Sequence, residues 1–169
     1  MPNVLLTCPI MAELVARHQP PRFDPEPAFP SLVACIMARL RTLVPIRPAA
    51  LAGADPRRLR RAGLSRAKAL YVRELARFTV DGGLRGLYRL EDAAIIERLT
   101  SVKGVGVWTA EMFLMFSLGR PDVWPIGDGG IQRAALNLYG ARTPRSLAKL
   151  GERFRPYRSH AAWYLWRSL

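Results

Sequence analysis

The sequence predicts an all-α fold. Apolar residues recur at helical spacing in most segments, proline and glycine separate those segments, and no convincing alternating strand pattern is present. The chain has 169 residues, of which 50% are hydrophobic, which is enough for a buried core and argues against disorder. We find no internal repeat beyond two generic helix-turn-helix units. We therefore expect one helical domain over residues 1–169.

Proline, glycine and capping residues bound the helices that we expect in the first half. Residues 9–17 predict a short amphipathic helix, and the prolines between residues 20 and 30 predict an extended linker. Ser31 caps a helix through about Leu43, which two further prolines end.

Two more helices are expected before residue 80. Asp55 is placed as an N-cap with Pro56 at the first helical position, and this helix stops at Gly63. Ser65 caps a longer helix over residues 66–80.

The stretch at about 91–117 predicts two helices joined by a tight glycine turn. Residues 91–99 form the first helix, and the chain from Thr109 onward is again helical and apolar on nearly every side. Gly104 and Gly106 supply a positive φ or a close backbone approach between them. Such a turn at a helix start leaves several backbone N–H groups pointing outward, and these can bind an anion.

Asp128 lies just before another helical run, over residues 131–139. A carboxylate at a helix N-terminus is favoured in its ionised form. Thr143 starts another short helix, and the last helix, over residues 157–166, is rich in aromatic residues.

The charge balance predicts a polyanionic partner. There are 26 basic and 13 acidic residues, which gives a net charge of +13. Six basic residues crowd one corner of the predicted fold: Arg57, Arg58, Arg60, Arg61, Arg66 and Lys68. This basic corner is either a solvated face or a phosphate contact, and the sequence does not decide between the two.

Composition argues against several other classes of protein. No apolar run approaches the ~20 residues that cross a bilayer, and we see no signal peptide, so we expect a cytoplasmic, nucleoid-associated protein. Cys8 and Cys35 give no disulfide framework. His18 and His160 show no metal-ligand spacing, so we expect no zinc site.

Three segments together resemble the helix-hairpin-helix DNA glycosylases, and within them the 3-methyladenine DNA glycosylase II group. They are the hairpin at residues 102–110, Gly127-Asp128, and residues 155–167. The resemblance runs from about Phe29 to the C-terminus. It implies the helix-hairpin-helix glycosylase fold, a compact helical bundle with an interdomain-like cleft.

The resemblance implies two roles for the hairpin. Its amides at Gly104 and Gly106, with Lys103 beside them, would meet a DNA phosphate. The main-chain carbonyls that would hold a monovalent cation, Na+ or K+, when DNA is bound are those of Thr100, Val102 and Val105. No cofactor is otherwise required. The alternative is a glycine-rich helix connection with no ligand.

Asp128 matches the family's essential aspartate. Cleavage of an N-glycosidic bond builds positive charge on the sugar, and a carboxylate stabilises that state and orients or deprotonates the attacking water. The alternative is an ordinary helix N-cap, and the two roles are compatible.

The resemblance places tryptophans in the substrate pocket. Trp108 takes the position where the lyase members of the superfamily carry a Schiff-base lysine, and Lys103 does not match that position, so we expect no lyase activity. Trp108 and Trp166 would line the pocket of a cationic alkylated base. Core packing is the alternative for both. It is the favoured interpretation for four other aromatic residues: Trp124, Tyr157, Trp163 and Tyr164.

The sequence departs from the family pattern at two places. A segment that carries the family's base-flipping wedge is shortened after Met37, where Met37 or Leu40 would have to substitute. Gly129 and Gly130 replace a larger apolar residue, which would loosen the helix start at Asp128 and widen the pocket.

The expected function is that of a monofunctional DNA glycosylase that removes alkylated purines, such as 3-methyladenine and 7-methylguanine, in base excision repair. Its partner would be double-stranded DNA containing damaged bases; we expect a monomer and no membrane contact. The shortened wedge segment keeps open a second hypothesis, a DNA-binding protein with weak or no catalysis. A third, a bifunctional glycosylase-lyase for oxidised bases, is disfavoured by Trp108.

Overall fold

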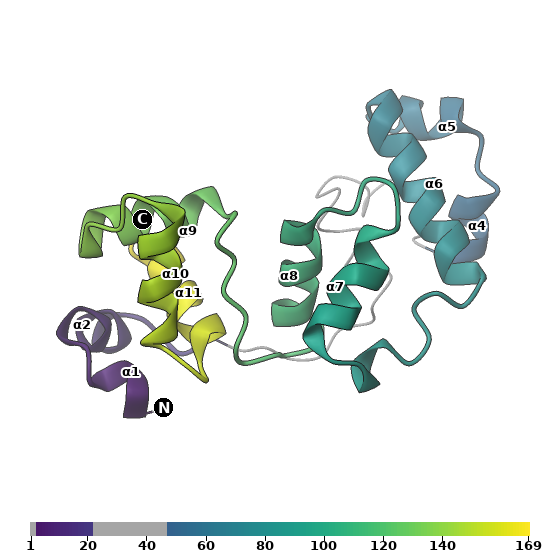
Figure 1. The fold of residues 1–169 in the computed structure, drawn as a ribbon. Helices are drawn as coiled ribbons and strands as arrows, with labels where there is room; N and C mark the ends of the chain where they lie inside the picture. The colour runs from purple at the N-terminus through teal and green to yellow at the C-terminus, as the bar shows by residue number, and fades with distance from the viewer. Residues whose placement is uncertain (1–2, 22–46) are drawn as a thin grey trace. The chain divides into compact units, whose positions relative to one another are not determined.

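The computed structural model describes residues 3–21 and 47–169, and over these residues it is helical with no β-strand (Figure 1). Contacts divide them into two compact units. One contains residues 3–21 and 119–169, and the other contains residues 47–118. The predicted all-α class is confirmed. The assignment of a single domain stays a prediction, because packing alone does not say which parts fold independently.

The first unit consists of five helices, which are α1 (Asn3–Leu6), α2 (Pro9–Arg17), α9 (Gly129–Tyr139), α10 (Pro144–Glu152) and α11 (Arg158–Arg167). Helix α11 packs against α9 and α2. Met11, Phe154 and Tyr164 are fully buried in its core. Burial of a large apolar side chain contributes about 1.5–3 kcal/mol, and Tyr164 is the one of these three residues that anchors α11 in the core.

The second unit begins with three helices, α4 (Pro48–Ala52), α5 (Pro56–Arg61) and α6 (Arg66–Val80). A 3-10 turn, η2 (Leu87–Arg89), leads to α7 (Asp92–Thr100) and α8 (Val107–Phe116). Helices α4 and α5 pack on α6, and α7 packs on α8. The helix-hairpin-helix unit expected at about 91–117 is therefore present as α7, the hairpin and α8.

Four of the predicted helix starts are observed with their caps. The side chains of Asp55, Ser65 and Asp128 each accept a hydrogen bond from an amide in the first turn of α5, α6 and α9. Thr143 and Ser146 form a reciprocal capping box on α10. These starts were predictable because the caps are local interactions.

Two short helices were not predicted. Helix α4 starts at Pro48, a residue expected to terminate structure, because proline is well tolerated at the first helical position. Helix α1 is a single turn, too short for an apolar period to be visible in the sequence. The expected helix from Ser31 to Leu43 and the candidate wedge residues Met37 and Leu40 lie outside the described residues. No helix in the described ranges is long and apolar enough to span a bilayer.

Candidate functional site

Asp128 closes the start of α9. Its Oδ1 accepts a hydrogen bond from the amide of Ile131 at 2.8 Å, and its own amide donates to the carbonyl of Pro125 at 3.0 Å. The carboxylate is thus held at the helix N-terminus, where the helix dipole stabilises its charge. The capping role of Asp128 is confirmed, and its catalytic role is a separate question.

Trp166 contacts the same carboxylate oxygen. Its indole Nε1 donates a hydrogen bond to Asp128 Oδ1 at 2.8 Å, across 38 positions of sequence. Trp166 is half-buried on α11. One oxygen therefore accepts from two N–H groups on different helices, which fixes the orientation of the carboxylate. Trp166 is a partner of the acid as well as a candidate wall of the pocket.

Gly130 makes room for this pair. A Cβ built on Gly130 would lie 2.9 Å from Trp166 Cδ1 and 3.0 Å from Asp128 Oδ1. At Gly130 the space left by the missing side chain is occupied by the indole, so this glycine does not widen a pocket. A Cβ on Gly129 would meet nothing within 4 Å, and α9 begins at this residue under the Asp128 cap. The expected loosening of the helix start is not observed.

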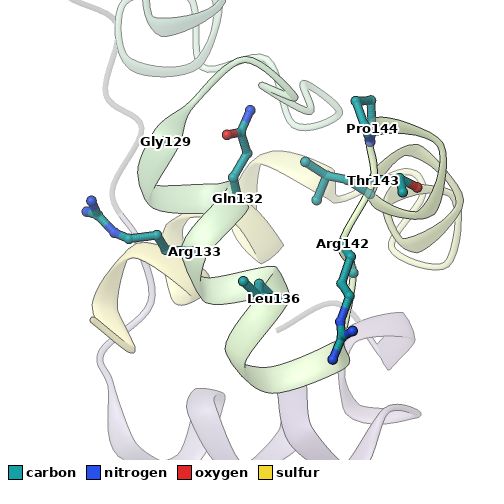
Figure 2. A pocket seen from close by; sticks show the side chains of 9 residues that line it. Gly129, Gln132, Arg133, Leu136, Arg142, Thr143 and Pro144 are labelled. Carbon is teal, nitrogen blue, oxygen red and sulfur yellow. The ribbon is translucent and has the colours of Figure 1, made fainter.

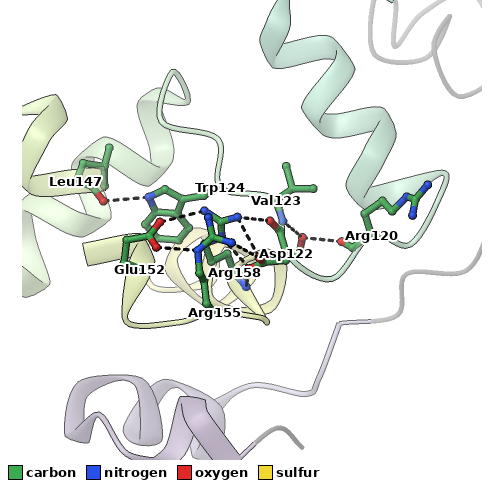
Figure 3. Close-up of polar contacts among 9 residues, drawn as sticks. Arg120, Asp122, Val123, Trp124, Leu147, Glu152, Arg155 and Arg158 are labelled. Carbon is green, nitrogen blue, oxygen red and sulfur yellow. Dashed lines mark hydrogen bonds and ion pairs between the residues drawn. The ribbon is translucent and has the colours of Figure 1, made fainter. Parts of the chain in front are cut away.

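A salt bridge fixes the segment that precedes Asp128 (Figure 3). Arg158, at the first position of α11, donates from Nε to Asp122 Oδ1 at 2.7 Å and from Nη2 to Oδ2 at 3.0 Å. Its Nη2 also donates to the carbonyl of Asp122 at 2.9 Å. The side chains of Arg158 and Asp122 are only 16% and 23% exposed, so this bidentate pair is better shielded than a surface ion pair. Arg155 and Glu152 extend it toward solvent.

Ser159 adds a second attachment beside that pair. It is fully buried; its Oγ donates to the carbonyl of Arg120 at 2.7 Å and accepts from the amide of Val123 at 3.0 Å. Its amide donates to the carbonyl of Pro121 at 2.9 Å. The segment of residues 120–123 is thus tied to α11, the helix that carries Trp166. The segment that leads to Asp128 and the helix that carries Trp166 are therefore bonded to each other directly.

Core packing, the favoured interpretation for the weaker aromatic candidates, is confirmed for two of them. Trp124 is buried and donates from Nε1 to the carbonyl of Leu147 at 3.0 Å. Tyr164 is fully buried. Tyr157 and Trp163 are half-buried on or beside α11.

A groove opens along α9 beside this site (Figure 2). Its volume is about 580 Å³, and it is lined by residues of α9, the loop after it and the start of α10: Gly129, Gln132, Arg133, Leu136, Ala141, Arg142, Thr143, Pro144 and Leu147. Gln132 donates from Nε2 to the carbonyl of Ile126 at 2.9 Å, which fixes one wall. The groove mixes aliphatic side chains with two arginines.

The hairpin of the second unit is a tight turn that lies on α6. Gly104 has φ +94°, and a Cβ added to it would lie 2.1 Å from Cγ of Tyr71. The amide of Val105 donates to the carbonyl of Val102 at 3.0 Å and closes the turn. Gly104 is therefore required twice, for its positive φ and for the close approach to the Tyr71 ring.

The hairpin presents backbone donors to solvent. Gly104 and Gly106 are exposed, and within residues 47–118 neither amide donates a hydrogen bond. Gly106 is the N-cap of α8 and has no side chain to satisfy the first amides of that helix. Lys103 is exposed beside them. This arrangement is suited to an anion such as a phosphate.

One of the three carbonyls implied as cation ligands, that of Val102, closes the hairpin turn. The carbonyl of Val102 accepts one bond, from Val105, and a carbonyl oxygen has a second lone pair. The cation at Thr100, Val102 and Val105 stays a prediction. Among the residues the structure describes, no group of three or more His, Cys, Asp or Glu side chains is placed to hold a metal.

Trp108 is the second residue of α8 and is 43% exposed. A core tryptophan would be covered, so core packing does not account for this side chain. Trp108 belongs to the hairpin unit, whereas Asp128 and Trp166 belong to the other unit.

Comparison with known proteins decides the family. Residues 31–156 match the model of the HhH-GPD superfamily of base excision DNA repair proteins. The chain belongs to this superfamily. The expected family and helix-hairpin-helix glycosylase fold are thereby confirmed.

Relatives of this HhH-GPD protein include several 3-methyladenine glycosylases. The chain is 37% identical over 118 residues to DNA-3-methyladenine glycosylase 1 of Schizosaccharomyces pombe, covering 65% of this chain and 51% of that protein. It is 33% identical over 128 residues to a putative DNA-3-methyladenine glycosylase of Bacillus subtilis, covering 73% of this chain and 45% of the relative. The matched regions span about half the length of these relatives.

A solved structure agrees with the sequence relatives. The S. pombe 3-methyladenine DNA glycosylase in complex with abasic DNA superimposes with a TM-score of 0.83 at 28% identity, covering 94% of this chain and 90% of that chain. A DNA-3-methyladenine glycosidase of Bacillus halodurans superimposes with a TM-score of 0.74 at 31% identity, covering 96% and 90%.

Two positioning residues of this HhH-GPD protein are not predicted from the sequence: Tyr71 supports the hairpin, and Arg158 holds the segment before Asp128. Gly130 is singled out in the sequence, but it admits the indole and does not widen a pocket. The Gly-Gly pair after Asp128 was the visible signal for Gly130. Nothing in the local sequence marked Tyr71 or Arg158, because their partners are distant along the chain.

Proposed function

We propose that this HhH-GPD protein is a monofunctional DNA glycosylase that excises alkylated purines, such as 3-methyladenine and 7-methylguanine, from double-stranded DNA. The observation that carries the proposal is the Asp128 carboxylate, held at the start of α9 by the Ile131 amide and the Trp166 indole. The relatives named as 3-methyladenine glycosylases favour the same substrate class.

In the proposed reaction the bond between C1′ of the sugar and the base breaks, and the base leaves with the bonding electron pair. The sugar becomes cationic in the transition state, and the negative charge of Asp128 stabilises it. Water then attacks C1′ and loses its proton, which Asp128 is suited to accept. The products are the free base and an abasic site in DNA.

Trp166 acts here as a positioning residue, because its N–H group fixes the carboxylate. Trp108 is 43% exposed, and an indole that stacks on a cationic alkylated base would contribute about 0.5–2 kcal/mol. Since an aromatic residue occupies this position in place of a lysine, we propose that no Schiff base forms and the DNA backbone is not cut.

The hairpin would hold the DNA. The exposed amides of Gly104 and Gly106, with Lys103, are suited to one backbone phosphate, a contact that carries no sequence information. Na+ or K+ bound to the carbonyls of Thr100, Val102 and Val105 would strengthen it by adding positive charge; no other cofactor is needed. The protein would act as a monomer.

The test is the release of methylated bases from alkylated duplex DNA under single-turnover conditions. Wild-type protein is expected to release free base, and Asp128→Asn is expected to lose at least about 100-fold of the rate, since Asn keeps the shape but not the charge. Asp81→Asn is the matched control, because this exposed aspartate directly after α6 makes no side-chain hydrogen bond or ion pair within the described residues. Equal release by wild type and Asp128→Asn would remove Asp128 from the mechanism.

Two further outcomes separate the alternatives. Tight DNA binding with no abasic sites formed at protein excess would identify a non-catalytic DNA-binding protein. A covalent adduct trapped by borohydride would identify a glycosylase-lyase, because only a Schiff base is trapped in this way.

A further inference from the structure

The basic corner of the sequence lies in the same unit as the hairpin. Its six residues, Arg57, Arg58, Arg60, Arg61, Arg66 and Lys68, are all exposed. None of the six side chains has an acidic partner within the residues that the structure describes. The nearby Asp55 uses its side chain to accept the amide of Arg57 and cap α5. Within the described residues, no acidic side chain neutralises the positive charge of this corner.

Three of these arginines surround a hollow. Arg57, Arg60 and Arg61, with Leu64, line a surface depression of about 360 Å³, which we call the arginine hollow. Leu59 lies buried beneath α5 and anchors the helix on α6. Arg58 of the same helix is exposed but does not line the hollow. Because α5 packs on α6, the backbone positions of the three arginines around the hollow are fixed.

The helix that carries the arginine hollow and the hairpin both pack on α6. Gly104 of the hairpin lies on Tyr71, and Lys68 is three residues earlier, on the same side of α6. In Figure 1 the hairpin loop passes beside the first half of α6, and α5 lies at the start of α6. With a rise of about 1.5 Å per residue, the start of α6 at Ser65 is about 9 Å along the axis from Tyr71.

That length matches the spacing of DNA phosphates. One strand presents a phosphate about every 3.4 Å along the duplex axis, so about 9 Å corresponds to roughly three phosphates. A strand that meets the hairpin amides and continues along α6 would therefore have further phosphates at about the distance of Lys68 and the α5 arginines.

We propose that Arg57, Arg60 and Arg61, together with Lys68, form a second phosphate-binding surface that extends the hairpin contact along duplex DNA. The proposal rests on the proposed function only in that the partner is DNA. Arginine suits this role because its guanidinium binds phosphate oxygens bidentately, while the positive charge alone supplies most of the salt-dependent affinity. The surface would contribute affinity without sequence preference.

The experiment measures the salt dependence of binding to a fluorescent duplex oligonucleotide that contains an abasic-site mimic. The slope of log K against log salt changes by about 0.9 for each phosphate contact. The triple variant Arg57→Gln, Arg60→Gln, Arg61→Gln is expected to reduce the magnitude of the slope by between about one and three. The triple variant with lysine at the same three positions is expected to keep the slope near the wild-type value, because lysine also binds phosphate as a point charge.

The control removes the same charge elsewhere. Arg145, Lys149 and Arg153 are exposed on or next to α10 and have no acidic partner in the described part of the chain. The glutamine variant of these three residues lowers the net charge equally, and we expect a slope near that of the wild type. The single variant Arg58→Gln removes one charge from α5 outside the hollow, and we expect its slope to stay near that of the wild type. Circular dichroism melts establish that each variant is folded.

The proposal would be overturned if the α5 glutamine variant had the same salt-dependence slope as the wild type. It would also be overturned if the slope of this variant fell by no more than that of the α10 variant. A lysine variant that loses as much as the glutamine variant, or wild-type protein that binds no DNA, would overturn it as well. Base release by the same proteins at saturating concentration separates the two claims. If the protein releases methylated bases but the α5 glutamine variant shows no slope change beyond that of the α10 variant, only the second phosphate-binding surface is rejected. If the α5 variant shows that slope change but the wild-type protein releases no base, only the glycosylase activity is rejected.

Discussion

Asp128 and Trp166 are joined by a hydrogen bond from the indole Nε1 to the carboxylate Oδ1, at 2.8 Å. The same oxygen caps α9 through Ile131. The candidate catalytic carboxylate therefore has one oxygen that accepts from two N–H donors, so its orientation is set by the protein before any substrate binds. Both α9, through the Ile131 amide, and α11, through the Trp166 indole, therefore orient the carboxylate.

Replacing Trp166 by Phe tests this contact. Phe keeps an aromatic face but removes the N–H donor, and a hydrogen bond to a charged group is worth about 1.5–3 kcal/mol. We expect kcat for base release to fall roughly 10- to 100-fold with a smaller change in KM, because the loss is one of orientation. The matched control is Trp163→Phe on the same helix, which is expected to retain activity. An unchanged kcat in Trp166→Phe would contradict the positioning role.

Replacing Gly130 by Ala tests the space that the indole occupies. The new methyl group would lie 2.9 Å from Trp166 Cδ1, so the indole has to move away from Asp128. We expect a loss of base release and a lower melting temperature. Gly129→Ala is the control: nothing lies within 4 Å of its Cβ, and a glycine-to-alanine change in a helix is expected to stabilise by about 0.5–1 kcal/mol. Equal effects of the two substitutions would refute the packing argument.

Replacing Arg158 by Ala tests the attachment of the segment before Asp128. The pair with Asp122 is largely shielded, and removal of one partner leaves a carboxylate in a partly buried position. We expect about 2–4 kcal/mol of lost stability in urea unfolding. Arg155→Ala, at the exposed end of the same network, is expected to cost much less. A similar loss for both variants would show that shielding does not govern this network.

The stability of the protein is expected to fall on acidification through His160. Burial lowers the pKa of His160 below its ordinary value of 6.5. Between that lowered pKa and about 6.5, the unfolded chain binds a proton that the folded chain does not, so the free energy of unfolding decreases as the pH falls below about 6.5. His160→Gln is expected to flatten this part of the profile in urea titrations at a series of pH values. A profile with the same slope in this variant would exclude His160 as the cause.

The helix starts and the helix-hairpin-helix unit could be predicted because their determinants are local. Asp55, Ser65 and Thr143 each bond to an amide within three positions, and Gly104 carries a conformational preference of its own. The fold class followed from these signals together with the lack of strand patterns.

The candidate site was predicted residue by residue, but its internal contacts were not. Asp128 and Trp166 are each predicted as site residues, but no local pattern indicates that the indole donates to the carboxylate, because 38 positions separate them. The same holds for Arg158 and Asp122, which are 36 positions apart. The sequence suggests that Gly130 leaves empty space in the pocket. The structure shows that the Trp166 indole, from α11, occupies that space.

The close packing of Gly104 against Tyr71 affects the entropy of ligand binding. With no room for even a methyl group between the turn and the ring, the loop has its shape before any ligand arrives. An incoming polyanion would not need to order this part of the chain, and so little conformational entropy is lost on association. A contact of this kind with a DNA strand would be preorganised, and its strength would depend chiefly on counterion release.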